Sequence, residues 1–164
     1  MLFRSADRVP LADVLGRVLA HALAAPLDVP SFDRANVDGF ALRAADTAGA
    51  ADAAPKRIAL NAEVIACGHA PKIEVQPGTA TTIATGGMLP RGADAVVMIE
   101  HTELIESIPA IELRRAALPG QFISYAGSDI ARGETLLRKG HAIGSREIGM
   151  LAACGLGEVD VVRR

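Results

Sequence analysis

Three short segments of the chain combine glycine with polar side chains that could take part in chemistry. They are DRANVDGFA at residues 33–41, IATGGMLPRGADAVV at residues 83–97 and AGSDIARGE at residues 126–134. In the first, Asp38 precedes Gly39, so the backbone can turn sharply while it presents a carboxylate. Such a carboxylate suits a hard cation such as Mg²⁺, or the acceptance of a proton. The alternative is a plain turn in which Asp38 bonds its own backbone, and the residues alone favour that alternative.

In the second segment, Thr85, Gly86 and Gly87 follow a short predicted strand. Consecutive glycines allow backbone N–H groups to converge on a phosphate or another oxyanion, and Thr85 adds a hydroxyl donor. The alternative is a flexible Gly-Gly turn, because a lone TGG is neither a Walker loop nor a dinucleotide fingerprint. In the third segment, Asp129 lies beside a glycine at a strand end, where an aspartate is more often a turn cap than a ligand.

The histidines and cysteines offer no further site. The four histidines show no metal-ligand spacing, and the two cysteines belong to no CxxC or Cys/His pattern. Neither a zinc site nor a disulfide framework is therefore expected. Glu100, His101, Glu103 and Glu106 alternate with apolar residues in a way typical of the solvated face of a strand.

Composition excludes several classes of protein. The chain has 164 residues, half of them apolar, and 17 basic and 19 acidic residues give a net charge of −2. This mixed charge lacks the basic footprint of a nucleic-acid binder. The first residues, MLFRSADR, carry charge where a signal peptide needs its apolar run, and no apolar stretch is long enough to span a bilayer. We expect a cytoplasmic protein with no membrane or nucleic-acid partner.

The hydrophobic pattern predicts a mostly β fold with α+β character at its margins. Short β segments are expected in the middle of the chain and towards its end, at residues 58–66, 81–84, 95–100, 102–106, 110–113, 121–125 and 159–162. An apolar stripe over residues 10–24 favours a helix before Pro26. Gly16 and the β-branched Val18 weaken its second half, and the alternative is that the stripe stops early and hands over to a strand. Ser145 is expected to cap a second helix that ends at Gly155. Compositional shifts predict a domain of residues 1–42 plus 121–164, with a β-rich module inserted at residues 43–120.

Taken in order, the three segments resemble the signature of the MoeA/gephyrin family, the molybdopterin molybdenumtransferases. The resemblance covers nearly the whole chain and extends to IGMLAACGLGEVDVVRR at residues 148–164, although residues 44–55 and 103–118 are variable. It implies bent and coiled β-sheets with a small inserted β module. It also implies an enzyme of molybdenum cofactor biosynthesis that inserts molybdate into adenylylated molybdopterin with the help of Mg²⁺, releasing AMP.

The same resemblance implies roles for individual residues. Asp38 matches the functional aspartate of a DGYA-like motif, Thr85 the threonine of a TG motif, and Asp129 the aspartate of a GxDI motif. The implied catalytic residues are these three, with Asp38 and Asp129 as Mg²⁺ ligands. Thr85 and the N–H groups of Gly86 and Gly87 are expected to bind phosphate or molybdate oxygens.

Two departures from the family pattern bear on these roles. Ala35, Asn36 and Val37 stand where the family usually has Ser-Ala-Met, and Phe40 replaces a tyrosine. Thr82 occupies a position where arginine is common in the family, which removes a possible oxyanion partner.

The resemblance also implies a composite site. Family enzymes continue past the strand at residues 159–162 into a pterin-binding domain and a C-terminal β domain, which we expect to be missing from this chain. They form homodimers in which the front region of one subunit meets the pterin domain of the other. The chain is thus expected to supply half of a dimer site and to be inactive alone. The alternative is a non-catalytic module of the same fold, used for dimerisation or oxyanion sensing.

Overall fold

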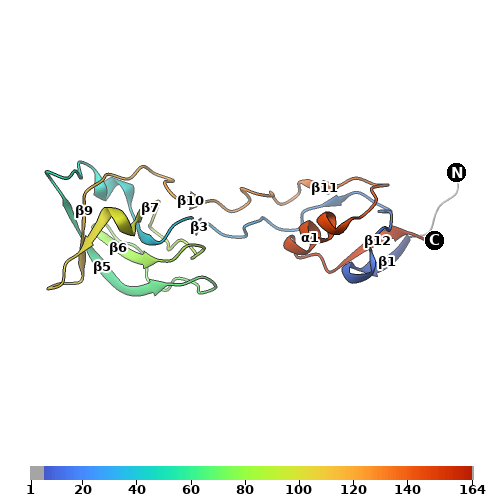
Figure 1. The fold of residues 1–164 in the computed structure, drawn as a ribbon, viewed down its shortest axis with the longest axis horizontal. Coiled ribbons are helices and arrows are strands. Elements are labelled where there is room, and N and C mark those ends of the chain that lie inside the picture. The colour runs from blue at the N-terminus through green and yellow to red at the C-terminus, as the bar shows by residue number, and fades with distance from the viewer. Residues whose placement is uncertain (1–5, 164) are drawn as a thin grey trace. The chain divides into compact units, whose positions relative to one another are not determined.

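The computed structural model describes residues 6–163 and confirms the predicted mostly β fold (Figure 1). The chain divides into two compact units, residues 1–31 with 126–164 and residues 32–125. The second unit thus begins earlier than the boundary expected at residue 43 and ends after the one expected at 120. The reason is that residues 32–42 pair with strands of this unit, as do residues 121–125.

The unit of residues 32–125 is built on a six-stranded sheet with the order β7-β4-β6-β5-β9-β8. Its strands are β4 (Gly39–Leu42), β5 (Lys56–Ile65), β6 (Thr79–Ile83), β7 (Ala95–Met98), β8 (Thr102–Leu104) and β9 (Ala110–Leu113). Strands β5 and β6 are parallel, and the other neighbours are antiparallel. A separate pair joins β3 (Arg34–Ala35) to β10 (Ile123–Ser124), and two short 3-10 helices are η2 (Ala44–Thr47) and η3 (Ile99–His101).

Both faces of this sheet are covered by apolar side chains. Because successive side chains of a strand point to opposite faces, Phe40 and Leu42 join one core cluster while Ala41 joins another. The first cluster also holds Ile58, Ala80, Val97, Ile111 and Leu113, and the second holds Ala35, Ile65, Ile83, Val96 and Ile123. Strand β4 is consequently buried along its whole length.

Position 39, the first residue of β4, requires glycine because neighbouring backbone packs closely against it, and not because the chain turns there. It pairs with Ile83 of β6 on one side and with Met98 of β7 on the other. A Cβ atom built on Gly39 would come within 1.9 Å of the carbonyl oxygen of Val97. No side chain therefore fits at this position without moving the neighbouring backbone.

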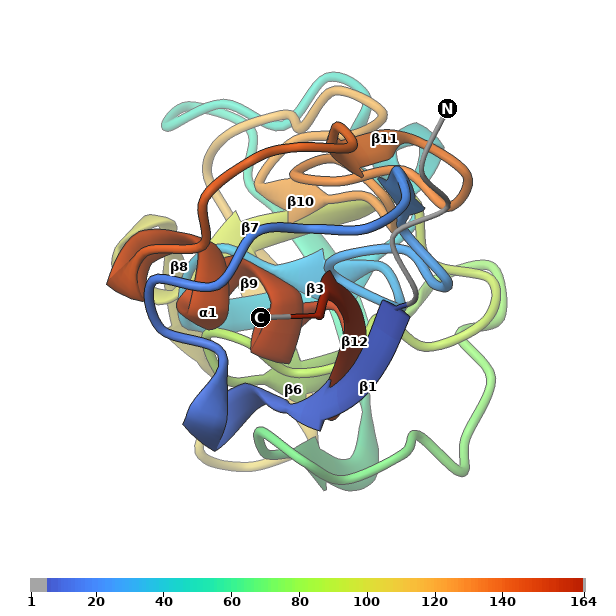
Figure 2. The ribbon, with the colours of Figure 1, turned by 90° about the vertical axis from the view of Figure 1, so that its right-hand side faces the viewer.

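The other unit is smaller and joins paired strands to one helix. Antiparallel pairs link β1 (Ala6–Pro10) to β12 (Glu158–Val162) and β2 (Leu23–Ala24) to β11 (Thr135–Leu137). Figure 2 shows β1 and β12 side by side, with α1 (Ser145–Ala153) next to them. The core of this unit is formed by Val14, Leu19, Leu137, Ile143, Leu151, Val159 and Val161.

The helix favoured over residues 10–24 does not form, and the alternative holds: the stripe stops early and hands over to a strand. Only the 3-10 turn η1 (Leu11–Asp13) forms, followed by isolated bridges and β2. Gly16 adopts a φ of 73°, a left-handed conformation that ends a helix. Beyond it the backbone bonds to distant segments: the N–H of Leu19 donates to His141 O and that of Ala20 to Asp160 O, both at 2.9 Å. Val14 and Leu19 of the stripe are buried in the core of this unit, whereas Leu15 and Val18 are exposed.

Helix α1 forms where a helix was expected, with a different cap. The residue before it is Gly144, whose N–H donates to Glu147 Oε2 at 2.9 Å, and Ser145 is already helical. Backbone hydrogen bonds from Glu147 itself and from Gly144 hold the pKa of the Glu147 carboxyl below its ordinary value. Gly155, with a φ of 74°, follows the helix end as expected.

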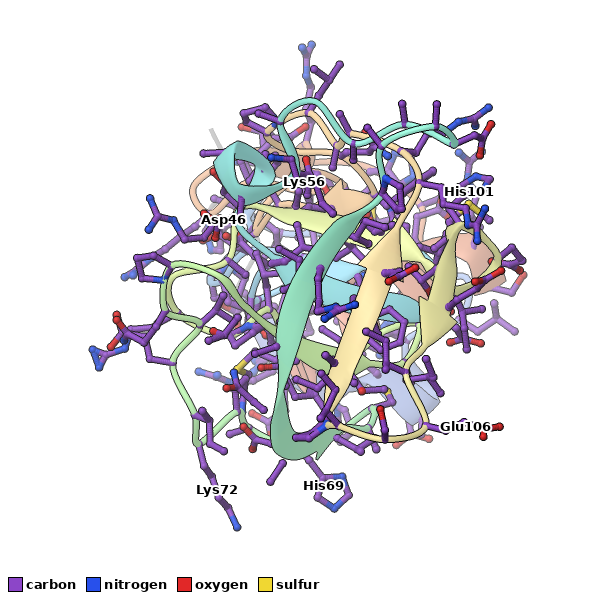
Figure 3. The ribbon with its side chains drawn as sticks, turned by 90° about the vertical axis from the view of Figure 1, so that its left-hand side faces the viewer. Asp46, Lys56, His69, Lys72, His101 and Glu106 are labelled. Atoms are coloured by element: carbon purple, nitrogen blue, oxygen red, sulfur yellow. The ribbon has the colours of Figure 1, made fainter. Side chains whose placement is uncertain are left out.

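Charged side chains cover the outer part of the sheet unit. Figure 3 shows Lys56, His69, Lys72 and Glu106 pointing outward around β5, β8 and β9. Glu100, Glu103 and Glu106 are exposed, but they do not form the face of one strand: only Glu103 lies on β8, whereas Glu100 and His101 belong to η3 and Glu106 to the turn after β8. Among residues 6–163, neither α1 nor any 3-10 helix has the length and apolar character needed to cross a membrane.

Replacing Gly39 by alanine tests the packing of β4. Gly39→Ala should destabilise the chain by about 1–3 kcal/mol, the usual cost of overpacking a core, because the added methyl group meets the Val97 carbonyl. Urea unfolding followed by circular dichroism measures the effect. Gly149→Ala is the matched control, since its Cβ meets no atom within 4 Å and alanine favours the helix. Equal stability of Gly39→Ala and the unmodified chain would contradict this account of the sheet.

Candidate functional site

Asp38 and Thr85 are brought together by the register of two strands. In the antiparallel pair of β4 and β6, Gly39 lies opposite Ile83. The residue before β4 and the residues after β6 therefore meet at the same end of the sheet. Residues 38 and 85 are 47 positions apart in the chain, yet their side chains are hydrogen-bonded.

The Asp38 carboxylate accepts two hydrogen bonds from one residue. Its Oδ1 accepts the backbone N–H of Thr85 at 2.7 Å and the Thr85 hydroxyl at 2.8 Å. Both side chains are exposed, while the neighbouring Val37 packs against the core. The turn in which Asp38 bonds its own backbone, which the residues alone favoured, is thus replaced by a contact between two strand ends.

These hydrogen bonds fix the charge of the carboxyl group. The backbone N–H of Thr85, and then its hydroxyl, hold the pKa of Asp38 below its ordinary value, against a smaller opposing effect of desolvation. Both bonds favour the charged form of the acid because they donate to a carboxylate oxygen. Asp38 is therefore an anion at neutral pH, which suits it to bind a cation and makes it a weak base.

The three N–H groups at residues 85–87, which were expected to bind an oxyanion, have acceptors within the protein. The N–H of Thr85 donates to Asp38, that of Gly86 to Ala35 O at 2.8 Å, and that of Gly87 to Ala84 O at 2.8 Å. All three donors are used within the protein. An anion held by this backbone would have to displace one of these bonds.

The local structure explains why glycine is present at positions 86 and 87. Gly86 has a φ of 78°, the left-handed conformation that favours glycine. Gly87 is buried, and a Cβ there would lie 2.8 Å from both Ala84 O and Ile83 Cγ1. The TGG pattern thus permits a tight turn that carries Thr85 to Asp38. A contact of either glycine with substrate stays a prediction.

Asp129 belongs to the other unit, so the structure does not join it to the Asp38–Thr85 pair. Its side chain is exposed, and its N–H donates to Val29 O at 2.9 Å. The same loop is tied down by Asp28, whose Oδ1 accepts the N–H of Arg132 at 2.8 Å. Sequence reasoning gave Asp28 no role, because its partner lies 104 residues away.

The residues that depart from the family pattern lie on two faces. Ala35 is 1% exposed and packs in the core, so residue 35 points away from the exposed carboxylate of Asp38. Asn36 is exposed, and its Oδ1 accepts the hydroxyl of Ser124 at 2.6 Å. No group of three or more His, Cys, Asp or Glu side chains within residues 6–163 has the geometry of a metal cage.

Comparison with known proteins identifies similar sequences. A family model described as the MoeA N-terminal region (domain I and II) matches residues 2–155. Molybdopterin molybdenumtransferase 2 of Mycobacterium tuberculosis is 39% identical over 156 residues, which are 95% of this chain and 38% of that protein. Molybdopterin molybdenumtransferase of Bacillus subtilis is 40% identical over 158 residues, 95% of this chain and 36% of that protein. The chain therefore spans less than two fifths of these relatives.

A solved structure has the same fold. The crystal structure of the molybdopterin biosynthesis MoeA protein from Pyrococcus horikoshii superimposes with a TM-score of 0.93 at 38% identity. The match covers 98% of this chain and 40% of that one. The mostly β architecture of both units is thus found within a longer protein.

Removal of the Thr85 hydroxyl tests the electrostatics of the pair. In Thr85→Val the pKa of Asp38 should rise towards the ordinary carboxyl value of about 4, because one of two hydrogen bonds to the charged form is lost. The carboxyl ¹³C shift of Asp38, followed by NMR from pH 7 to pH 2, measures this change. Thr82→Val, a threonine of the same strand pair, should leave it unchanged.

The stability of the Thr85→Val variant should also depend on pH in a defined way. A lowered folded-state pKa contributes stability that is present above the unfolded value of about 4 and is lost as pH falls through the folded value. Thr85→Val should therefore be less stable than the unmodified chain at pH 7, and the two urea midpoints should converge in acid. A difference that stays constant down to pH 2 would contradict the assignment to Asp38.

Proposed function

Because this chain belongs to the family of MoeA N-terminal regions, we propose that it forms part of a molybdopterin molybdenumtransferase. This enzyme inserts molybdate into adenylylated molybdopterin and releases AMP during molybdenum cofactor biosynthesis. The proposed residues are Asp38, Thr85 and Asp129. The observation that carries the proposal is the hydrogen-bonded pair of Asp38 and Thr85, two motif residues that the sheet register brings together.

The chemistry of Asp38 fits Mg²⁺. Thr85 occupies Oδ1 and holds the carboxyl in its charged form, so that an exposed, hard oxygen ligand is available at neutral pH. Mg²⁺ in proteins is often bound through one or two carboxylates together with substrate phosphates. When bound, the ion would neutralise charge on the oxyanions that react. Asp129 is the second proposed ligand.

Each of the three proposed site residues has its own task. Asp38 holds a fixed negative charge at the strand end, and Thr85 orients that carboxylate and supplies a hydroxyl oxygen at the same place. Asp129 contributes a carboxylate from the loop that Val29 and Asp28 tie down. The pterin would be bound by other parts of the enzyme, since the chain corresponds to 38% of the M. tuberculosis relative.

We further propose that the working form is a cytoplasmic homodimer in which this region meets the pterin-binding domain of a second subunit. The chain then supplies half of a composite site. On its own it should show no turnover of adenylylated molybdopterin. Robust AMP release by the isolated chain would contradict this arrangement.

The direct test is complementation between two defective proteins. A full-length family enzyme is disabled at the aspartate that matches Asp38 and mixed with this chain, and AMP release is followed with molybdate and Mg²⁺. Restored turnover is expected, with at least a tenfold loss when this chain carries Asp38→Asn. Asp52→Asn, an exposed aspartate of the variable loop, is the matched control and should restore turnover fully.

Sedimentation velocity must show mixed dimers before the result is interpreted. Mixed dimers without restored turnover would favour the alternative function, a non-catalytic module for dimerisation or oxyanion sensing. Restored turnover that survives Asp38→Asn would remove Asp38 from the catalytic residues.

A further inference from the structure

Asn36 and Asp38 are exposed residues of one short segment, two positions apart in the chain. Ala35 and Val37 both pack against the second core cluster of the sheet unit. Asn36 and Asp38, in the bend between β3 and β4, are both exposed, whereas Ala35 is buried and Val37 is half-buried. Two residues of chain span at most about 7 Å, which limits the separation of the Cα atoms of Asn36 and Asp38. A ligand held at Asp38 is therefore within reach of Asn36.

Ser124 fixes which atoms Asn36 presents. The Ser124 hydroxyl donates to Asn36 Oδ1 at 2.6 Å, and the pairing of β10 with β3 places Ser124 opposite Arg34. An asparagine whose carbonyl oxygen is engaged in this way turns its NH₂ group, with two donors, away from the serine. The amide nitrogen of Asn36 is thus oriented as a donor on the exposed face.

A strained residue supports this arrangement. Phe122 has a φ of 55°, and it is the only non-glycine residue between 6 and 163 with a positive φ. Bulky side chains rarely adopt this conformation, and such residues cluster at functional sites. The carbonyl of Phe122 accepts the N–H of Asn36 at 2.9 Å, and its ring packs against the same core cluster as Val37. The strained turn thereby holds β10, and with it Ser124, against Asn36.

We propose that the side-chain amide of Asn36 donates a hydrogen bond to a substrate oxyanion beside Asp38. This inference rests on the proposed function and adds to it a binding residue with its ligand class. The oxyanion is either molybdate or a phosphate of the adenylylated pterin. A neutral donor suits this position, because an arginine or lysine there would form an ion pair with Asp38 and compete with a cation for its carboxylate.

The chain is well suited to a direct measurement. Its side-chain amides are those of Asn36, Asn61, Gln76 and Gln121, so an ¹⁵N spectrum contains four NH₂ pairs. The folded, ¹⁵N-labelled chain is titrated with molybdate and, separately, with inorganic phosphate, each with and without Mg²⁺. The Asn36 pair should shift in a saturable way. The Asn61 pair is the internal control, because its nitrogen already donates to buried Thr81 Oγ1 at 2.8 Å.

Three variants separate binding from folding. Asn36→Asp keeps an acceptor for Ser124 but replaces the donor by a charge, so the backbone signals of Asp38 and Thr85 should lose their response to the anion. Ser124→Ala frees the amide and should weaken the affinity severalfold. Ser107→Ala, an exposed serine of the turn between β8 and β9, should bind the anion unchanged. The backbone spectrum of each variant reports whether it is folded.

Each outcome bears on the inference. A shift of the Asn36 pair with molybdate alone, or with phosphate alone, supports it and identifies the source of the oxyanion. A response of the Asp38 and Thr85 signals without one from Asn36, or unchanged affinity in Asn36→Asp, overturns it and leaves the proposed function standing. No shift of any signal with either anion also overturns it, and the complementation assay then decides the proposed function separately.

Discussion

Strand β4 lies between β6 and β7 at a separation that leaves no room for a side chain at residue 39. The ideal Cβ of Gly39 would stand 1.9 Å from the Val97 carbonyl oxygen, so any other residue there would force the backbone of the two ladders to shift. In this register Gly39 lies opposite Ile83 of β6 and Met98 of β7. The register in turn decides which residues leave the sheet at its end, and these are Asp38 before β4 and Thr85 beyond β6.

Much of the sheet follows from local sequence. The segments at residues 58–66, 81–84, 95–100 and 110–113 are rich in β-branched or apolar residues between glycines and prolines, and strands occur at each of them. The three glycine-containing motifs were also recognisable, because their order along the chain is specific to one family. The pairing of β4 with β6 was not predictable in this way, since it joins backbone groups of segments that are distant in the chain.

At two places the structure differs from the local sequence pattern for a common reason. The stripe at residues 10–24 has helical spacing, yet Leu19 and Ala20 give their N–H groups to residues more than a hundred positions away. The glycines after Thr85 could have formed an anion nest, yet Ala35 accepts the N–H that Gly86 would have offered. In both places local propensity was overridden by backbone partners from distant parts of the chain, which no single-sequence pattern contains. Ser124 was missed on the same ground, since its partner Asn36 lies 88 residues away.

The charge of the Asp38 carboxyl group also decides which kinds of chemistry this site can support. A general base works best when its pKa lies near the working pH, whereas Thr85 lowers that of Asp38. A fixed carboxylate is better matched to a cation, and a cation beside it can in turn attract an oxyanion that the bare carboxylate would repel. On this view three groups have complementary roles: the glycine at residue 39, the hydroxyl at residue 85 and the amide at residue 36. The first places the carboxylate, the second keeps it charged, and the third is the donor that we propose for an anion.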